Sequence, residues 1–445
     1  MKTLKLGIFL AILFLIGTEI AGAKTLFGAG EFYLHNGMRV IVVPNHRVPI
    51  IKHMLWYKAG AADEIIGKGG TAHLLEHMMF RGTNKIKGQN FNRLMEEMGA
   101  ESNAFTGQDM TVYHQLLDKT RLEAVMYLEA DRMQNLQMNN QDVATERDIV
   151  FEERKQRIDN NPLAKFGEIL RRILWQNHAY GRPVTGTDEE IKSLSKDDLL
   201  NFYRNYYAPN NAVLVLAGDI NLKEAKFFAE KYYGDISESE IIEANSKELV
   251  NGFKAKIEVE DKDIQGVRII KMMASPSFGK DNDDIYELQL LAAYMGDGES
   301  SKLYKKLVIE DKKALNVTVD YNPLSRSYGT FSISMLPVAE ITVTEAIKFL
   351  TDAWNDALDE LNEKEIAKVK EKISAGLVYL RDNPEDAAYI VGSMAVSGMS
   401  LSEIEAQEQR LRAVNYDKVK KAAERLMNNA PQVLGILKPK GYKNG

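Results

Sequence analysis

Residues 69–82 read GGTAHLLEHMMFRG, and the interpretation of the chain starts from this stretch. Nothing between residues 71 and 81 breaks a helix, and the glycine that follows is a C-terminal stop signal. At about 100° per residue, His73, Glu76 and His77 fall within about a third of the helix circumference. Two imidazoles and one carboxylate therefore share one face of the predicted helix.

This set of side chains has the composition of a metal site. Two histidines one helical turn apart can bind a single Zn²⁺ ion through ring nitrogens. A carboxylate between them that is not itself a ligand can take a proton from a water at the metal, which points to Glu76 as a general base. The H-x-x-E-H order, the reverse of H-E-x-x-H, is typical of inverzincin peptidases. Five positions are a weak pattern, and the alternative is two surface histidines that happen to lie four residues apart.

Length and composition limit the possible classes of protein. A chain of 445 residues predicts two or more domains with full cores. The net charge of −6 gives no support for nucleic-acid binding, which requires a basic surface. The chain has no cysteine, so any zinc must be held by histidine, aspartate or glutamate.

The N-terminus reads as an export signal over residues 1–23. Lys2 and Lys5 form a short positive region, residues 6–16 an apolar core, and residues 21–23 an A-x-A cleavage site. The apolar run is too short to span a bilayer, and no later stretch is long and apolar enough. We expect an exported protein, periplasmic or secreted, with an uncleaved membrane anchor as the alternative.

Strands are predicted on both sides of the histidine-bearing helix. The Asn36-Gly37 pair between two apolar runs is a tight-hairpin signal. Residues 103–106 and 111–116 read as two strands around a short turn. Residues 141–158 read as a helix. The first half of the chain is therefore expected to mix helices with an antiparallel sheet.

A helix followed by a strand occurs twice. Residues 197–207 and 213–216 have counterparts in residues 417–427 and 433–436, each 220 positions later. An internal duplication explains a constant offset economically. The predicted fold class is therefore α+β, with two homologous domains. Two unrelated α+β domains are the alternative.

We place the domain limits by composition. Residues 236–252 are rich in Glu, Ser, Asn and Lys and read as a linker, which leaves residues 24–235 as the first domain and residues 253–445 as the second. All seven histidines lie between residues 35 and 178. If the domains are duplicates, only the first can hold the metal.

A third ligand is expected from the helix at residues 141–158, which offers Glu146, Glu152 and Glu153. Glu146 and Glu153 lie seven residues apart on a face that also carries two valines, whereas Glu152 is about 100° away. Carboxylates on an apolar face are costly to bury unless a cation meets them. Ordinary ion pairs with Arg147, Arg154 or Arg157 are the alternative.

Taken together, these residues resemble the pitrilysin/insulinase family of zinc peptidases. His73 to His77, followed by Glu146 to Glu153, carries the resemblance, which is strongest to small bacterial members and to the mitochondrial processing peptidase β subunit. It extends from about residue 30 to residue 440. Other landmarks of the family are the Asn36-Gly37 hairpin and residues 60–64, 103–106 and 180–183.

The resemblance implies roles for particular residues. His73, His77 and Glu153 would be the ligands of one Zn²⁺ per chain, and Glu76 the general base. Glu146 would orient a ligand by hydrogen bonding, as metal sites commonly require. Two homologous domains would enclose a cleft in which peptides or unfolded protein segments are hydrolysed.

The resemblance also implies a substrate-binding edge. Residues Asn103, Ala104 and Phe105 would lie on the strand with which an extended substrate pairs, giving affinity through the backbone. The expected activity is zinc-dependent endopeptidase. The alternative is a non-catalytic core or assembly subunit of the same fold, which has no need to keep all four residues of the site.

The second half departs from the family pattern. Active members usually carry there an Arg followed seven residues later by a Tyr, both reaching the substrate carbonyl. Glu310 and Val317 stand at these positions. Arg326 and Tyr328 are only two residues apart and read as turn and strand residues. We therefore expect a homologous partner subunit that supplies the Arg/Tyr pair, or otherwise a homodimer.

Overall fold

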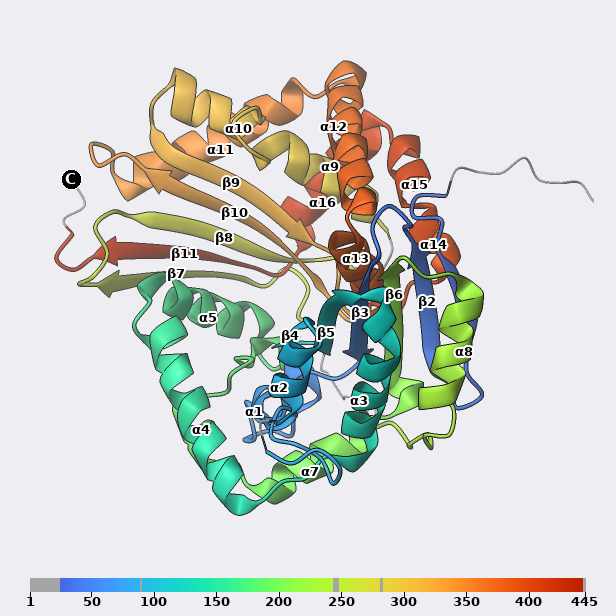
Figure 1. The fold of residues 1–445 in the computed structure, drawn as a ribbon. Helices are drawn as coiled ribbons and strands as arrows, with labels where there is room; N and C mark the ends of the chain where they lie inside the picture. The colour runs from blue at the N-terminus through green and yellow to red at the C-terminus, as the bar shows by residue number, and fades with distance from the viewer. Residues whose placement is uncertain (1–24, 89, 243–247, 281–282, 443–445) are drawn as a thin grey trace, which may run out of the picture.

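The computed structural model describes residues 25–88, 90–242, 248–280 and 283–442 (Figure 1). The predicted export signal lies outside these residues. Within them, no helix has both the length and the apolar character needed to cross a membrane. Two sheets with helices packed on their faces make up the described chain.

The first half contains a six-stranded sheet in the order β1-β2-β6-β3-β5-β4. β2 and β6 are parallel, and the other neighbours are antiparallel. The Asn36-Gly37 turn joins β1 to β2, with Gly37 at a φ of 83° that favours glycine. The strands are β1 (Gly30–Tyr33), β2 (Arg39–Pro44), β3 (Ile50–Tyr57), β4 (Glu101–Thr106), β5 (Thr111–Asp118) and β6 (Ala212–Gly218).

The second half contains a five-stranded sheet in the order β7-β11-β8-β10-β9. Here β7 and β11 are parallel, and the other neighbours are antiparallel. The strands are β7 (Lys254–Asp261), β8 (Arg268–Ser275), β9 (Ala314–Asn322), β10 (Gly329–Pro337) and β11 (Gln432–Pro439).

The two sheets share one topology. Without β1, the first sheet runs β2-β6-β3-β5-β4, and each strand has a counterpart at the same place in the second sheet. In both, a parallel pair contains the last strand of its half, β6 or β11, which directly follows a helix. The predicted duplication of an α+β unit is therefore confirmed.

The helices lie around and between the sheets. Those of the first half are α1 (Thr71–Met78), α2 (Asn90–Glu97), α3 (Leu122–Asn135), α4 (Asn140–Arg154), α5 (Pro162–Trp175), α6 (Asp188–Ser193), α7 (Lys196–Tyr206) and α8 (Leu222–Tyr233). Those of the second half are α9 (Ile285–Gly296), α10 (Lys302–Tyr304), α11 (Val343–Asp359), α12 (Glu363–Asp382), α13 (Pro384–Val396), α14 (Leu401–Glu405), α15 (Gln407–Ala413) and α16 (Tyr416–Asn429).

Each half covers one face of the other half's sheet with a helix. α5 packs on the second sheet, where a Cβ at Gly435 would come within 2.5 Å of Leu170. α13 packs on the first sheet, where a Cβ at Gly392 would come within 2.2 Å of the Trp56 ring. All seven residues of β6 are buried, as expected for a strand covered on both faces. The two halves are therefore interlocked (Figure 1).

The predicted helix over residues 141–158 is divided in the structure. α4 ends at Arg154, and a π-helical segment, η3 (Lys155–Asp159), follows it. At the predicted linker, α8 ends at Tyr233 and β7 begins at Lys254. The exact domain limits stay a prediction.

Candidate metal centre

The helix that carries both histidines begins at a buried carboxylate. The backbone amides of Gly70 and Ala72 donate to Glu64 Oε2 and Oε1 at 3.0 and 2.8 Å. A carboxylate at this end of a helix satisfies free N–H groups and interacts favourably with the helix dipole. Burial raises the pKa of Glu64 well above its ordinary value. Glu64 therefore fixes where α1 starts.

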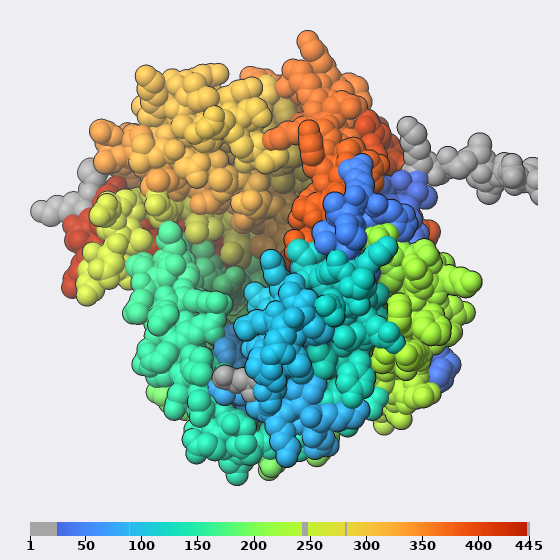
Figure 2. Space-filling view, in the orientation of Figure 1, coloured from blue at the N-terminus to red at the C-terminus, as the bar shows by residue number. Residues whose placement is uncertain are grey.

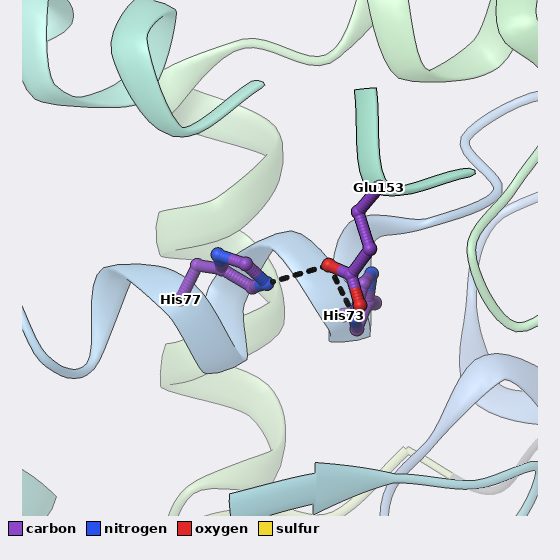
Figure 3. Close-up of side chains that lie close together, drawn as sticks. All are labelled: His73, His77 and Glu153. Carbon is purple, nitrogen blue, oxygen red and sulfur yellow. Dashed lines mark ion pairs between the residues drawn. The ribbon is translucent and has the colours of Figure 1, made fainter. Parts of the chain in front are cut away.

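His73, His77 and Glu153 meet across the gap between α1 and α4 (Figure 3). Glu153 Oε2 lies 3.7 Å from His73 Nε2 and 3.3 Å from His77 Nε2. Two atoms bound at about 2.1 Å to one tetrahedral ion lie about 3.4 Å apart. Among the described residues this is the one group with the spacing of a metal site. The donor set and its distances thus fit Zn²⁺.

The histidine environments also fit a metal. Burial, with the neighbouring His77, lowers the pKa of His73, and this favours the neutral imidazole that metals bind. For His77, burial lowers the pKa, but hydrogen bonds with Glu146 and Glu153 outweigh it and raise the pKa to about 9. Carboxylates that favour a proton at this point would equally favour a divalent cation.

Glu146 lies behind the metal-binding face. Its Oε2 is 2.9 Å from His77 Nδ1, so His77 directs its other ring nitrogen, Nε2, to Glu153. Arg81 donates to the Glu146 carboxylate as well. This is the placement that an orienting carboxylate requires. Sequence reasoning did not find Arg81, although its position four residues after His77 on the same helical face was an available signal.

Glu76 points from α1 into the cavity that His73, His77 and Glu153 also line. Thr106 Oγ1 on β4 donates to Glu76 Oε2 at 2.5 Å. Burial raises the pKa of Glu76. Glu152, the rival third ligand, has a side chain that is 61% exposed and pairs with Lys155, away from the histidines. The structure thus brings together five of the predicted residues, His73, Glu76, His77, Glu146 and Glu153, and leaves Glu152 out.

The centre opens into a cavity of about 720 Å³. Asn103, Ala104 and Phe105 of β4 line it. β4 is an edge strand, paired only with β5 among the described residues, so its other edge is open to an extended peptide. Figure 2 shows this face hollowed between α4 and α2.

The π-helical segment brings a further cation to this cavity. Arg157 lines the cavity, and its Nη1 lies 2.6 Å from Glu153 Oε1. π-Helical segments are frequent at functional sites. Sequence reasoning had named Arg157 only as an ordinary ion-pair partner of a glutamate, because nothing in the local pattern predicts the change of helix type.

The described part of the second half contributes no residue to the cavity lining. Glu310 is exposed at the end of the π-helical segment η6 (Lys305–Glu310), and Val317 is buried in β9. Arg326 and Tyr328 lie in the turn before β10, as predicted, and bind elsewhere: Arg326 to Asp63 and Asp109, Tyr328 to Glu248 and Lys280.

Comparison with known proteins agrees with this geometry. Residues 39–188 match the family model described as "Insulinase (Peptidase family M16)", and residues 193–373 match the model described as "Peptidase M16 inactive domain". The chain belongs to the M16 peptidase family. The candidate metal centre lies within the first matched region, and the second covers much of the half without histidines.

Several relatives of this M16 protein carry names of peptidases. "Zinc protease PqqE" of Helicobacter pylori is 28% identical over 314 residues, which is 70% of either chain. The mitochondrial-processing peptidase β subunit of Mus musculus is 24% identical over 416 residues, covering 91% of this chain and 83% of that one. A crystal structure of a protease from Helicobacter pylori superimposes with a TM-score of 0.86 and 23% identity, covering 92% and 99% of the two chains. The last comparison shows the fold.

Proposed function

We propose that this protein is a zinc-dependent endopeptidase that hydrolyses peptides or unfolded protein segments. The observation that carries the proposal is the convergence of His73, His77 and Glu153 on one point, with Glu76 in the same cavity. The names of the M16 relatives support a peptidase.

His73, His77 and Glu153 would hold the ion, and Glu146 would keep His77 oriented. A bound Zn²⁺ supplies Lewis acidity, which lowers the pKa of a coordinated water to about 7 and polarises the substrate carbonyl. Glu76 takes a proton from the attacking water and delivers it to the leaving amine. Thr106 holds Glu76 in place from β4, beside which the substrate backbone lies.

The rival function is a non-catalytic core or assembly subunit. Such a protein needs the interlocked halves, but it does not need metal ligands and a general base in the cavity. A ligand triad, an orienting carboxylate and a separate carboxylate held by Thr106 together favour the enzyme, since a storage or structural zinc site has no use for Glu76.

Metal analysis and a quenched-peptide assay test the proposal. We expect about one Zn²⁺ per chain, and hydrolysis that is lost on chelation and restored by zinc. Glu153→Gln should weaken zinc binding by more than the roughly 10- to 100-fold typical of an orienting carboxylate. The matched control is Glu152→Gln, which changes an exposed neighbour and should leave zinc and activity unchanged. Zinc loss in the control alone would contradict the assignment.

We also propose that a homologous partner subunit completes the site. The described second half places no Arg or Tyr in the cavity, whereas the family resemblance implies an Arg/Tyr pair that reaches the substrate. A heterodimer with a chain that carries the pair would supply these donors, and a homodimer is the alternative assembly.

Export is a further part of the proposal. Leu26 and Phe27 are buried, and the amides of Phe27 and Ala29 donate to the Glu405 carboxylate at 2.8 and 2.7 Å, so the residues just after the predicted cleavage site pack against the second half. N-terminal sequencing of protein from the periplasm or medium should begin at Lys24. An intact N-terminus on cytoplasmic protein would contradict export.

A further inference from the structure

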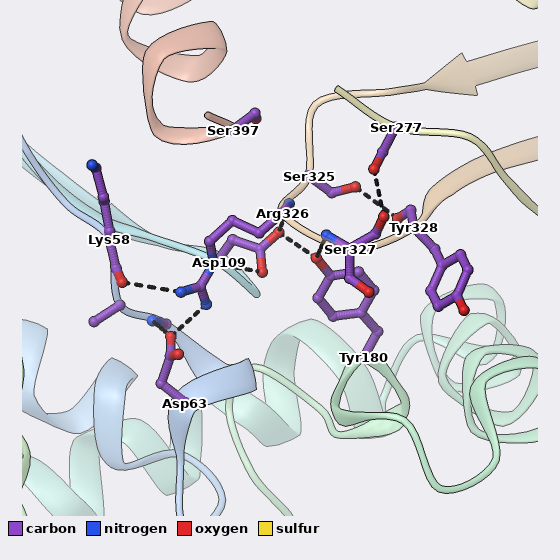
Figure 4. Close-up of polar contacts among 12 residues, drawn as sticks. Lys58, Asp63, Asp109, Tyr180, Ser277, Ser325, Arg326, Ser327, Tyr328 and Ser397 are labelled. Atoms are coloured by element: carbon purple, nitrogen blue, oxygen red, sulfur yellow. Dashed lines mark hydrogen bonds and ion pairs between the residues drawn. The ribbon is translucent and has the colours of Figure 1, made fainter. Parts of the chain in front are cut away.

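A loop of the second half sends Arg326 across to the first half (Figure 4). Arg326 Nη2 lies 2.6 Å from Asp63 Oδ2, and Nε lies 3.2 Å from Asp109 Oδ1. Its Nη1 donates to the Lys58 carbonyl at 3.2 Å, and its backbone amide donates to Asp109 Oδ2 at 3.0 Å. The side chains of Asp63 and Asp109 are 1% and 5% exposed, so each carboxylate depends on its partners for compensation.

Asp63 connects Arg326 to the start of α1, the helix that carries His73 and His77. Asp63 ends the short helix η1 (Ala61–Asp63) and also accepts the Gly60 amide at 2.9 Å. The next residue, Glu64, is the carboxylate that binds the first amides of α1. A shift of Asp63 would therefore move Glu64 and, with it, the helix that carries His73.

Asp109 connects Arg326 to Glu76, the proposed general base. Asp109 lies in the turn between β4 and β5. The carbonyls of Gly107 and Gln108 in this turn accept the amides of Ala61 and Ala62 at 3.1 and 2.8 Å. The last residue of β4 is Thr106, which donates to Glu76. The same guanidinium thus binds both segments that hold α1 and Glu76 relative to each other.

We propose that Arg326 is a positioning residue for the reaction: it fixes the loop that begins α1 and the turn that ends β4, so that Glu76 and the histidines keep their relative geometry. This inference rests on the proposed function. The second half thereby acts on a cavity that none of its described residues lines. Misplacement of a reacting group by about 1 Å can cost on the order of 10²-fold in rate.

A second ion pair between the halves provides a matched control. Lys52 on β3 lies 2.7 Å from Glu385 on α13, and the Lys52 side chain is 6% exposed. Arg326→Gln and Glu385→Gln each remove one charge from an ion-pair contact that joins the halves. The first leaves the two buried carboxylates of Asp63 and Asp109, and the second leaves the buried Lys52 ammonium. Only the Arg326 pair adjoins the α1 loop and the β4–β5 turn.

The experiment compares Arg326→Gln, Arg326→Lys and Glu385→Gln with the wild type. Amide hydrogen exchange of residues 60–76, zinc release to a chelator, kcat and KM are measured, with thermal melting to match stability. In Arg326→Gln we expect faster exchange at the start of α1, zinc release at least about 10-fold faster and a kcat lower by about 10²-fold, with KM little changed. Low millimolar guanidinium should restore kcat in this variant. Glu385→Gln is expected to lower the melting temperature, but it should leave exchange at the start of α1, zinc release, kcat and KM unchanged.

Equal effects in Arg326→Gln and Glu385→Gln, or no effect in either Arg326 variant, would overturn the inference. If Arg326→Gln does not fold, Arg326→Lys provides the same comparison, because lysine keeps the charge but loses the fork that spans both carboxylates. Hydrogen exchange needs neither zinc nor turnover. A wild type that is inactive both alone and with a homologous partner subunit would therefore count against the proposed function, while the exchange comparison would still decide the role of Arg326.

Discussion

Glu76→Gln is expected to keep the fold and about one Zn²⁺ per chain while lowering kcat by about 10²- to 10⁴-fold, because an amide cannot accept the proton. The change is nearly isosteric, and Thr106 can still donate to the amide oxygen of the new side chain. Burial already disfavours the charged carboxylate, so its removal should not destabilise the protein. Metal analysis measures the zinc content, thermal melting measures the stability, and the quenched-peptide assay measures kcat.

The control for this variant is again Glu152→Gln, which neutralises a glutamate outside the cavity. Full activity in Glu76→Gln would remove Glu76 as the base. Loss of zinc in Glu76→Gln would instead place Glu76 among the ligands, in conflict with the separation of its side chain from the triad.

The clustering of the candidate metal ligands could be predicted from sequence because their relations are local. Helical spacing alone places His73, Glu76 and His77 on one face, and the same rule separates Glu153 from Glu152 on the next helix. The constant offset of 220 residues predicted the duplicated topology for a related reason, since a repeat leaves a trace in sequence order.

Contacts between the halves left no such trace. Nothing in the α5 or α13 sequences shows that each packs on the sheet of the other half, because an apolar helix face is equally suited to either sheet. Arg326 has the same difficulty: its partners, Asp63 and Asp109, are more than 200 positions away. The sequence predicts only a turn position for this arginine, whereas the structure shows it bound to two buried carboxylates.

The largest gain in activity is expected from a partner subunit. The isolated chain should bind zinc but cleave peptides poorly, and addition of a homologue that lacks H-x-x-E-H but carries the Arg/Tyr pair should raise kcat by about 10²- to 10³-fold. This is the range that one oxyanion donor can contribute. The chain has its candidate metal ligands and Glu76 in one cavity, but the described second half offers no donor there.

A partner whose Arg and Tyr are replaced should still associate but fail to restore activity, which separates donation from mere stabilisation. Vigorous cleavage by the isolated chain, shown by light scattering to be a monomer or homodimer, would defeat the partner hypothesis. Arg326 and Tyr328 would not then be the replacement donors, because both are engaged outside the cavity. The residue to change would be Arg157, whose side chain is 71% exposed, lines the cavity and lies beside Glu153. Loss of kcat in Arg157→Ala, with zinc retained, would show that the first half supplies its own oxyanion donor.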